Sequence, residues 1–509
     1  MNDMTPPAAR SEPPAVRLAR LFAAQRAASR AEPAPSVRVR RARLVALRRQ
    51  IRRYQDVLAQ AISADFGFRP AAETRMLDLL GCVLEANHAI ARVGRWMRPS
   101  RRRTELLFLT NSLRVTYQPK GVVGIIAPWN FPVYLTLGPL VAALAAGNRA
   151  MIKMSEATPA ANAVLARLLG EVFGEDEVAV VGGELADPAA FAALPFDHLV
   201  FTGSPRVGRL VMRSAADNLT PVTLELGGKS PALVLRDYPI ADAARRIAHG
   251  KSVNGGQICV APDYALVPRE SVEPFVAAAK ASFADMYGAR FRDSPDFTWV
   301  ASDGHLARLH ALLDDARAKG AVVIPCADYI PARDGRRMPL HIVVDCRDDM
   351  RIMQEELFGP VLPVAPYDSL DDAIGFVNAR ERPLALYCFS RDAAQQRAVL
   401  DRTHSGGVTI NDWGWHVVNH DAPFGGSGNS GMGSYHGVEG FRELSHARTV
   451  FKRHRLFPIG LFHPPYGALL QNLTLRFFLG RGDPSLRPPA SQAPAGDGPR
   501  GDASPREST

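Results

Sequence analysis

The sequence predicts an α/β protein built around two mainly parallel sheets. Between Gly121 and Gly228, and again from about residue 230 to 410, short apolar runs alternate with segments of helical periodicity. This alternation is typical of doubly wound parallel sheets covered by helices. The composition agrees, because 47% hydrophobic and 22% charged residues are ordinary values for a globular protein. A chain of 509 residues has room for about three domains.

Each of these two regions contains five apolar runs that we expect to be strands. Sheets of this kind bind ligands beyond the carboxyl ends of their strands, so the residues that follow each run are candidates for a site. The first region is expected to hold strands at 121–127, 150–155, 178–181, 198–203 and 221–228, with helices near 137–146, 158–170 and 205–217. The expected strands of the second region read ALVL, YALV, AVVI, HIVVD and LALYCFS.

Three segments lie outside this alternating pattern. Residues 1 to about 16 are rich in Pro and Ala and predict a loose arm. Residues 101–118 are expected to form a β-ribbon with a turn near Asn111 and Ser112. Residues 481–509 consist largely of Pro, Gly, Ser and Ala, a composition that predicts disorder.

The net charge of +10 belongs to the N-terminal part of the chain. Thirteen arginines and three acidic residues lie within residues 1–53, whereas the remainder carries 48 charges of each sign. A basic face over the body of the protein is therefore absent, which argues against a nucleic-acid partner. Ser36 is a suitable N-cap for a helix whose apolar residues recur every three or four positions as far as Ile62. The arginines expected mostly on its solvated face are Arg40, Arg41, Arg48, Arg49, Arg52 and Arg53.

The cysteines and histidines carry no signature of a metal site or a disulfide framework. The five cysteines are an odd number, widely spaced, and none forms a CxxC pair. His416 and His420 lie four residues apart, but no third ligand is evident, so no metal is expected. No apolar leader follows the first Met and no uninterrupted apolar run reaches 18 residues, which together predict a cytoplasmic protein.

Three residues have the chemistry of a catalytic site. Cys259 follows two glycines in NGGQICVAP, where a thiolate could attack a carbonyl group, although a lone Cys is also a common buried apolar residue. Glu225 ends an apolar strand and is either a general base in a crevice or a structural acid paired with Lys229. Asn130, in PWNFP, is either an oxyanion donor or a turn residue.

A second group of residues is suited to a nucleotide. FTGSPRVG at 201–208 places two glycines between an expected strand and an expected helix. It is neither a Walker loop, because Arg209 and Leu210 replace the required Lys and Ser/Thr, nor a GxGxxG motif. Lys153 and Glu156 end a neighbouring strand, where a cation and a carboxylate suit ribose hydroxyls.

Read jointly, these segments resemble the aldehyde dehydrogenase superfamily. The resemblance extends from about residue 17 to 450 and rests on blocks that occur in order: PWNFP, KMSEATP, FTGSPRVG, TLELGGKSP, GQIC, EELFGP and PFGGSGNSGMGSYHG. Within the superfamily, GQICVAPDYALVP and SGMGSYHG are similar to the class 3 branch, and more narrowly to bacterial coniferyl aldehyde dehydrogenases.

The resemblance implies a role for each candidate residue. Cys259 would be the nucleophile, Glu225 the general base, and Asn130 an oxyanion donor together with the backbone N–H of Cys259. NAD would be the cofactor, because the charge of Glu156 should repel the 2′-phosphate of NADP, although some class 3 members accept both. The residues implied in cofactor binding are Trp129, Lys153, Glu156, Gly203, Ser204, Gly208, Glu356 and Phe358.

The resemblance also implies a domain organisation and a homodimer. An NAD-binding domain of the Rossmann type would comprise 17–100 and 119–228, and an α/β catalytic domain would comprise 229–420. The ribbon at 101–118, together with 421–455, would be the oligomerisation element. The apolar segment 456–480 would pack back on the dimer, and contact with a membrane surface is an alternative for it.

The substrate is less constrained than the reaction. Trp413 and Trp415 stand where class 3 relatives usually have smaller or single aromatic residues, and they either stack on a phenylpropenal or pack against the loop at 423–437. A medium or long-chain aliphatic aldehyde is the alternative substrate. Two rival functions are an acyl-transferring relative that uses CoA, which Glu225 argues against, and a binding protein that keeps the fold without turnover.

Overall fold

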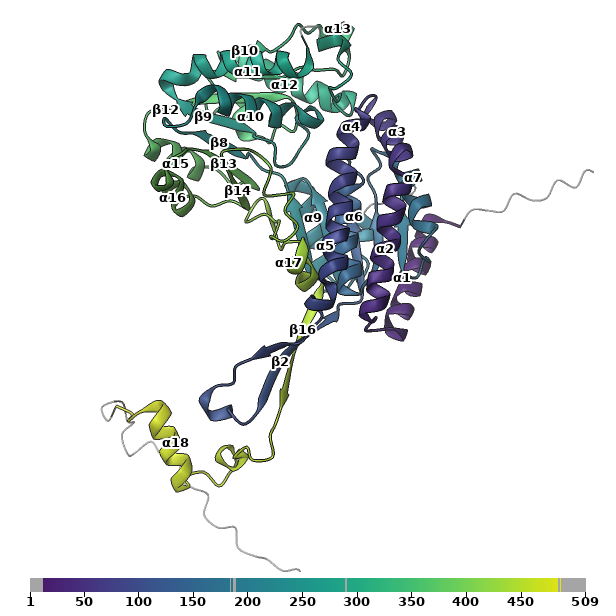
Figure 1. Ribbon diagram of the computed structural model, residues 1–509, viewed down its shortest axis with the longest axis vertical. Helices are drawn as coiled ribbons and strands as arrows, with labels where there is room; N and C mark the ends of the chain where they lie inside the picture. The colour runs from purple at the N-terminus through teal and green to yellow at the C-terminus, as the bar shows by residue number, and fades with distance from the viewer. Residues whose placement is uncertain (1–11, 184, 186–188, 289–290, 484–485, 487–509) are drawn as a thin grey trace, which may run out of the picture. The chain divides into compact units, whose positions relative to one another are not determined.

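The computed structural model describes residues 12–183, 185, 189–288, 291–483 and 486 (Figure 1). The chain divides into two compact units. The first consists of Met1–Ser100 and Val115–Thr449, and the second of Arg101–Arg114 and Val450–Thr509. The first unit contains both of the sheets that the alternating pattern predicts, so the predicted α/β class is confirmed.

The first sheet has the strand order β15-β7-β6-β3-β4-β5, and all neighbours run parallel except β15, which is antiparallel to β7. From β3 the chain continues through β4 to β5 on one side, and β6 and β7 then follow on the other side of β3. This reversal opens a crevice at the carboxyl ends of β3 and β6. The strands are β3 (Val122–Ile126), β4 (Arg149–Lys153), β5 (Val178–Val181), β6 (His198–Gly203), β7 (Val222–Leu226) and β15 (Gly431–Met432), and the crossing helices are α6 (Tyr134–Ala146), α7 (Pro159–Gly170) and α9 (Pro205–Ala216).

The second sheet has seven strands in the order β10-β11-β12-β9-β8-β13-β14, and only β10 is antiparallel to its neighbour. Two of these strands, β12 and β14, were not predicted. Strand β12 carries Pro363 and Pro366, which disfavour a strand assignment because proline donates no backbone hydrogen bond. The strands are β8 (Pro231–Val234), β9 (Tyr264–Pro268), β10 (Val322–Pro325), β11 (His341–Val344), β12 (Val361–Tyr367), β13 (Ala385–Phe389) and β14 (Gly407–Ile410).

Helices cover the second sheet and continue the alternation. The long ones are α10 (Ile240–Ser252), α11 (Val272–Tyr287), α12 (Asp303–Ala318), α15 (Leu370–Asn378) and α16 (Ala393–Arg402). The first unit also contains short α-helices, namely α4 (Ala71–Glu73), α8 (Ala189–Ala192), α13 (Pro331–Asp334), α14 (Arg351–Gln354) and α17 (Gly437–Glu443).

The N-terminal helices differ from the prediction at two points. Helix α1 (Pro14–Ala31) includes the last three residues of the expected loose arm, because Pro14 has a backbone angle suited to the first turn of a helix. Of the other arm residues, 1–11 lie outside the described part. The single helix expected after Ser36 is broken at Tyr54 into α2 (Val37–Arg53) and α3 (Gln55–Phe66), whereas Ser36 is confirmed as an N-cap through the backbone N–H of Val39.

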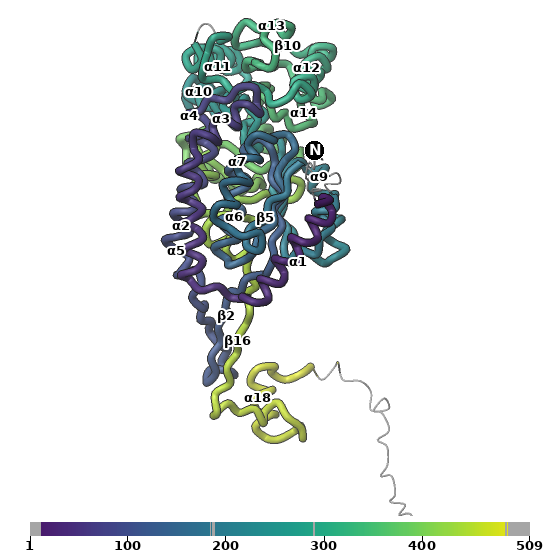
Figure 2. Tube along the Cα trace, turned by 90° about the vertical axis from the view of Figure 1, so that its right-hand side faces the viewer, coloured from purple at the N-terminus to yellow at the C-terminus, as the bar shows by residue number. Residues whose placement is uncertain are grey.

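Helices α2 and α5 (Leu80–Trp96) run side by side and both contact α6 (Figure 1 and Figure 2). This packing buries one arginine that was expected to be solvated. Arg40 is 2% exposed and donates to the carbonyl oxygens of Ala145 at 3.0 Å and Ala146 at 2.6 Å, at the C-terminus of α6. The C-terminal carbonyls of a helix attract a cation, which accounts for the placement. Burial lowers the pKa of Arg40 to about 10.

The remaining arginines of this face fit the prediction better. Arg48 is half-buried and donates to Asn87 at 2.7 Å. The arginines that are exposed, as predicted, are Arg41, Arg49, Arg52 and Arg53.

A three-stranded sheet has the order β1-β2-β16, with β1 (Ser100–Arg102), β2 (Ser112–Pro119) and β16 (Ser445–Lys452). The expected turn near Asn111 and Ser112 is replaced by a longer connection that contains a 3₁₀ helix at Leu106–Phe108. The reason is that Asn111 closes this connection, donating from Nδ2 to the carbonyl oxygen of Phe108 and accepting from the backbone N–H of His454.

The second unit is rich in exposed apolar side chains. Phe108 stacks on Phe457 and Phe462, with ring centroids 5.6 and 6.0 Å apart. Helix α18 (Leu469–Leu479) leaves Leu469 and Phe477 exposed. Among the described residues, no helix has the length and apolar character needed to cross a bilayer. The tail expected at 481–509 lies almost entirely outside the described residues.

Replacing Arg40 with Met should destabilise the first unit. The substitution keeps the buried volume but leaves the carbonyls of Ala145 and Ala146 without their charged donor, which costs about 2 kcal/mol. Urea denaturation followed by circular dichroism measures this as a lower midpoint. Arg49→Met, at an exposed position of the same helix, is the matched control, and equal midpoints for both variants would contradict the capping role.

Candidate active site

Cys259 follows a turn that only a few residue types can form. Asn254, Gly255 and Gly256 have φ values of 52°, 59° and 69°, so three successive residues occupy the left-handed region. A Cβ atom on Gly256 would lie 2.5 Å from the carbonyl oxygen of Gly359, and one on Gly255 would lie 3.0 Å from that of Thr298. The glycines before the thiol are therefore required by both backbone angle and space.

Asn254 has the same backbone angle without being glycine, and neighbouring groups hold it in place. Its backbone N–H donates to the carboxylate of Glu73 at 3.1 Å, and its Nδ2 donates to the backbone oxygen of Asn130 at 3.1 Å. Gln257 adds a further brace, because its Nε2 donates to the backbone oxygens of Asn254 at 2.8 Å and of Trp299 at 3.0 Å. The loop that carries Cys259 is thus fixed on several sides.

Asn130 lies beyond the carboxyl end of β3 and is buried against this same loop. Its Nδ2 donates to the backbone oxygen of Gln257, two residues before Cys259, at 3.1 Å. The backbone oxygen of Asn130 accepts from the buried Arg69, whose guanidinium also pairs with Asp78 at 3.4 Å. The structure therefore brings Asn130 and the Cys259 loop together.

Glu225 is the last residue but one of β7 and is 3% exposed. Neither carboxyl oxygen has a hydrogen-bond partner within the described part of the chain. Burial, and then the charge of Glu443, raise the pKa of Glu225 well above its usual range. The alternative of an ion pair between Glu225 and Lys229 is wrong, because Lys229 pairs with Asp263 at 2.7 Å.

The Cys259 thiol shares its surroundings with two carboxyl groups. The side chain is half-buried, and its pKa is raised to about 12 by burial, then by the charges of Glu356 and Glu225. Glu356 lies against the backbone that follows β7, since a Cβ atom on Gly227 would be 1.9 Å from its Oε2. Burial, and then Asp263, raise the pKa of Glu356 to about 8. One nucleophile and two acids with high pKa values are typical of an active site.

Phe358 and Trp129 form one wall near Glu356. Their rings meet edge to face, with centroids 5.4 Å apart at 77°. Phe358 has a φ of 53°, an angle that a bulky residue seldom adopts. Its carbonyl oxygen lies 2.6 Å from Nε2 of His305, whose ring also contacts Trp129. The backbone of EELFGP is therefore held in an unusual conformation that directs the Phe358 ring.

The buried ion cluster around Asp263 was missed by the sequence analysis. Asp263 pairs with Lys229 at 2.7 Å and with Lys251 at 3.0 Å; Asp263 and Lys251 are buried, and the Lys229 side chain is 9% exposed. Burial by itself would raise the pKa of Asp263, but the two lysines overcome this and hold it below its usual value. Lys229 also donates to the backbone oxygen of Glu355, and Asp263 accepts from the backbone N–H of Leu357. The cluster thus positions the segment that carries Glu356.

Only a weak sequence signal could have found this cluster. Asp263 and Lys251 flank the GQIC block, where charged residues interrupt an otherwise apolar and glycine-rich stretch. Arg69 and Asp78 show no comparable signal. Arg69 lies in the loop between α3 and α4, and Asp78 lies in a π-helix (Thr74–Leu79), far from every motif.

Apart from Glu356 and Phe358, the predicted cofactor residues lie at or shortly after the carboxyl ends of strands in the first sheet. Lys153 ends β4 and pairs with the largely exposed carboxylate of Glu156 at 3.2 Å. Ser204 follows β6 at Gly203 and caps α9 through the backbone N–H of Val207. A Cβ atom on Gly208 would lie 2.7 Å from Cδ2 of Leu226, so glycine permits the close approach of α9 to β7.

A cleft of about 480 Å³ lies beside these strand ends and the segment 353–356. It is lined by the start of α9 and by the turn after β7. The lining residues nearest the predicted site are Pro205, Gly227, Gly228, Lys229 and Glu356.

The two tryptophans after β14 have different surroundings. Trp413 packs on α10, where a Cβ atom on Gly250 would be 2.6 Å from its ring, and its Nε1 donates to His249 at 3.0 Å. This contact accounts for Trp413 by packing, although against α10 and not against the loop at 423–437. Trp415 is 57% exposed.

Comparisons with known proteins agree on one family. The model of the aldehyde dehydrogenase family matches residues 11–450. A probable coniferyl aldehyde dehydrogenase of Pseudomonas aeruginosa is 51% identical over 463 residues, which cover 91% of this chain and 96% of that protein. The substrate-bound structure of Staphylococcus aureus AldH has a TM-score of 0.85 at 33% identity, covering 90% of this chain and 99% of that one. An aldehyde dehydrogenase of Mycobacterium tuberculosis complexed with NAD⁺ has a TM-score of 0.77 at 29% identity, covering 86% and 90%.

Replacing Glu356 with Gln should make the Cys259 thiol more acidic. The Glu356 carboxylate raises the pKa of the thiol, so removing the charge lowers that pKa and shifts the alkylation profile toward lower pH. The carboxyl group ionises near pH 8, so the variant should react with iodoacetamide a few-fold faster than the wild type only above about pH 8. Glu355→Gln is the control, and identical profiles for Glu356→Gln and wild type would refute the coupling.

Proposed function

The chain belongs to the aldehyde dehydrogenase family, and within that family we propose that it oxidises an aromatic aldehyde of the phenylpropenal type, such as coniferyl aldehyde, to the carboxylic acid. It is an enzyme that oxidises an aldehyde with a nicotinamide dinucleotide. The observation that carries the proposed site is a buried, unpaired Glu225 beside the Cys259 thiol, with Asn130 bound to the same loop.

We assign the nucleophilic step to Cys259. Its thiolate adds to the aldehyde carbon, and the carbonyl oxygen gains negative charge as the C–S bond forms. Asn130 donates one amide hydrogen to Gln257 and has a second for that oxygen, together with the backbone N–H of Cys259. Because Asn130 is buried and anchored, this donor is in position before the substrate arrives.

A nicotinamide cofactor, when bound, would supply the hydride acceptor that the tetrahedral adduct on Cys259 needs to become a thioester. Glu225 then accepts a proton from water, which attacks the thioester and releases the acid. The carboxyl group must be ionised to do this. Since burial raises the pKa of Glu225, the hydrolytic step should become faster as pH rises.

The strand ends of the first sheet are suited to NAD. The capped N-terminus of α9, next to Gly203, Ser204 and Gly208, would hold the pyrophosphate. Lys153 and Glu156 would bind the adenosine ribose. Support comes from the cleft of about 480 Å³ beside α9, which is large enough to admit part of a dinucleotide. Glu356, with Phe358 and Trp129, would contact the nicotinamide ribose and ring.

The aromatic substrate is favoured by the 51% identical relative and by the resemblance to bacterial coniferyl aldehyde dehydrogenases. A medium or long-chain aliphatic aldehyde is the second candidate. Trp415 is exposed and so is available to stack on an aromatic substrate. Trp413 packs against its neighbours and donates to His249, which argues against a stacking role for Trp413. Use of CoA in place of water is disfavoured by the presence of Glu225.

A homodimer formed through 101–118 and 421–455 stays a prediction, as do the domain boundaries and the cytoplasmic location. The exposed apolar side chains of α18 are compatible with a dimer contact, and contact with a membrane surface is the alternative.

The reaction can be divided into its two steps with Glu225→Gln. This variant should still form the thioester, giving a burst of about one NADH per site, and its steady-state rate should fall by roughly a hundredfold or more. Cys259→Ala should show neither phase, and the exposed Glu273→Gln should behave as wild type.

Coniferaldehyde should have a higher kcat/KM than benzaldehyde or hexanal, and a preference for hexanal would favour the aliphatic alternative.

Cofactor choice should depend on Glu156. Wild-type enzyme should have a higher kcat/KM with NAD than with NADP, because the carboxylate repels a 2′-phosphate. Hydrogen bonding to its own backbone N–H, and then Lys153, lower the pKa of Glu156, so the charge is present at neutral pH. Glu156→Gln should reduce the preference several-fold, whereas Glu175→Gln, an exposed control, should not. A wild-type preference for NADP would refute this role.

A further inference from the structure

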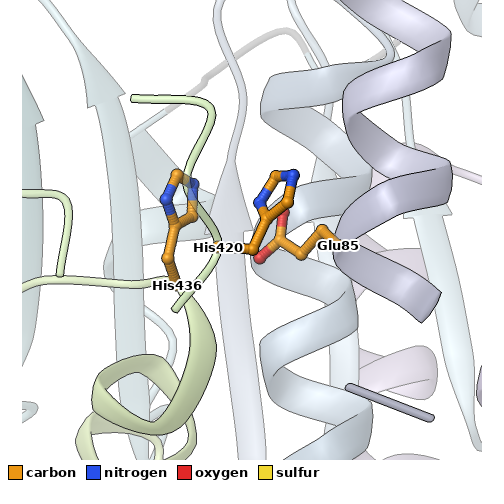
Figure 3. Close-up of side chains that lie close together, drawn as sticks. All are labelled: Glu85, His420 and His436. Carbon is orange, nitrogen blue, oxygen red and sulfur yellow. The ribbon is translucent and has the colours of Figure 1, made fainter. Parts of the chain in front are cut away.

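A cluster of three buried side chains lies apart from the residues assigned to catalysis and to NAD. Glu85 comes from α5, His420 from the loop after β14, and His436 from the residue before α17 (Figure 3). Each is at least nine-tenths buried. One ligand atom from each residue lies within 4.8 Å of the other two. Segments separated by more than 300 residues in sequence thus place a carboxylate and two imidazoles together.

Four polar atoms of this cluster have no partner among the residues that the structure describes. Oε2 of Glu85, both ring nitrogens of His420 and Nδ1 of His436 are buried without a hydrogen bond to any residue that the structure describes. Buried polar groups in folded proteins are nearly always paired with protein, water or a metal ion. Three residues that each bring one unpaired buried atom to the same point indicate a shared ligand.

The orientation of His436 is set from its other side. Its Nε2 lies 3.1 Å from the hydroxyl of Tyr134, and Phe424 stacks on the ring with centroids 5.4 Å apart at 21°. A proton on Nε2 that is donated to the Tyr134 oxygen leaves the lone pair on Nδ1, the atom without a partner. Metal-binding histidines generally use the second nitrogen in this way, and the contact fixes both tautomer and ring orientation.

We propose that Glu85, His420 and His436 bind one divalent transition-metal ion, with Zn²⁺ as the best-suited ion. Two imidazoles and one carboxylate are a known ligand set for zinc, which leaves the fourth position for water. Bonds of about 2 Å hold donor atoms within about 4 Å of one another, so the three side chains close by about an ångström on binding.

The proposal changes the expectation drawn from sequence spacing. His416, four residues before His420, does not belong to the group of ligand atoms that lie within 4.8 Å of one another, and its Nδ1 lies 2.8 Å from the hydroxyl of Thr409. The ligands come instead from α5 and from both ends of the segment 420–436. Within that segment, Gly431 of β15 pairs with Glu225 of β7. The ion would therefore fasten to α5 the segment that backs the catalytic strand.

The test uses the full chain in a Cys259→Ser background, which removes the reactive thiol as a competing zinc ligand. After treatment with EDTA and dialysis, the protein should bind one equivalent of Zn²⁺ by elemental analysis, and Zn²⁺ should raise its Tm. Co²⁺ in place of Zn²⁺ should give visible absorption bands of a four- or five-coordinate site. Less than a tenth of an equivalent bound, or no Co²⁺ bands, would overturn the proposal without reference to any variant.

Substitutions locate the site. Glu85→Gln, His420→Asn and His436→Asn should each lose the bound ion and the metal-dependent rise in Tm. Tyr134→Phe should weaken binding about tenfold, because it removes the hydroxyl that orients His436. His416→Asn is the matched control and should bind one equivalent. If all three ligand variants bind Zn²⁺ as tightly as the parent, the ion lies elsewhere and the assignment is wrong.

Discussion

The active site depends on the left-handed turn at Asn254, Gly255 and Gly256. Without it, the chain leaving α10 could not place Cys259 beside β3 and β7. The turn is unfavourable for a non-glycine residue, so other groups must hold it. Glu73 accepts from the backbone N–H of Asn254, and Asn130 accepts from its side chain. The proposed oxyanion donor is consequently part of the structure that supports the nucleophile, and neither can move independently.

Burial accounts for the raised pKa values of Glu225 and Cys259, and Asp263 is the exception. Glu225 and Cys259 both have raised pKa values because they lack a compensating charge, which favours their neutral forms. Asp263 is equally buried but has two lysine partners, so its pKa is low. Glu225 is therefore left unpaired, which suits the general base that we propose, whereas Asp263 is bound in an ion cluster. The difference between them lies in their partners and not in their depth.

The N-terminal arginines show that tertiary contacts decide whether a charged side chain of a helix is solvated or buried. The helical pattern assigns them mostly to a solvated face, and for the exposed members this is right. Arg40 departs from the pattern because the C-terminus of α6 lies against α2 and attracts a cation. Its neighbour Arg43, also buried, pairs with Glu177. Part of the excess charge is thus used inside the molecule to join helices to the first sheet.

The sequence by itself determined the α/β class and the parallel strands of the first sheet, and it selected Cys259, Glu225 and Asn130 as candidate site residues. These features are local, because apolar periodicity and glycine positions depend on neighbouring residues. Only the tertiary structure decided the pairing of Lys229 with Asp263 and the burial of Arg40. It also placed strand β12 in the middle of a sheet despite its prolines, and it gathered Glu85, His420 and His436 from distant segments. Such contacts join residues far apart in the chain, and side-chain type and spacing carry no information about which distant partner each will meet.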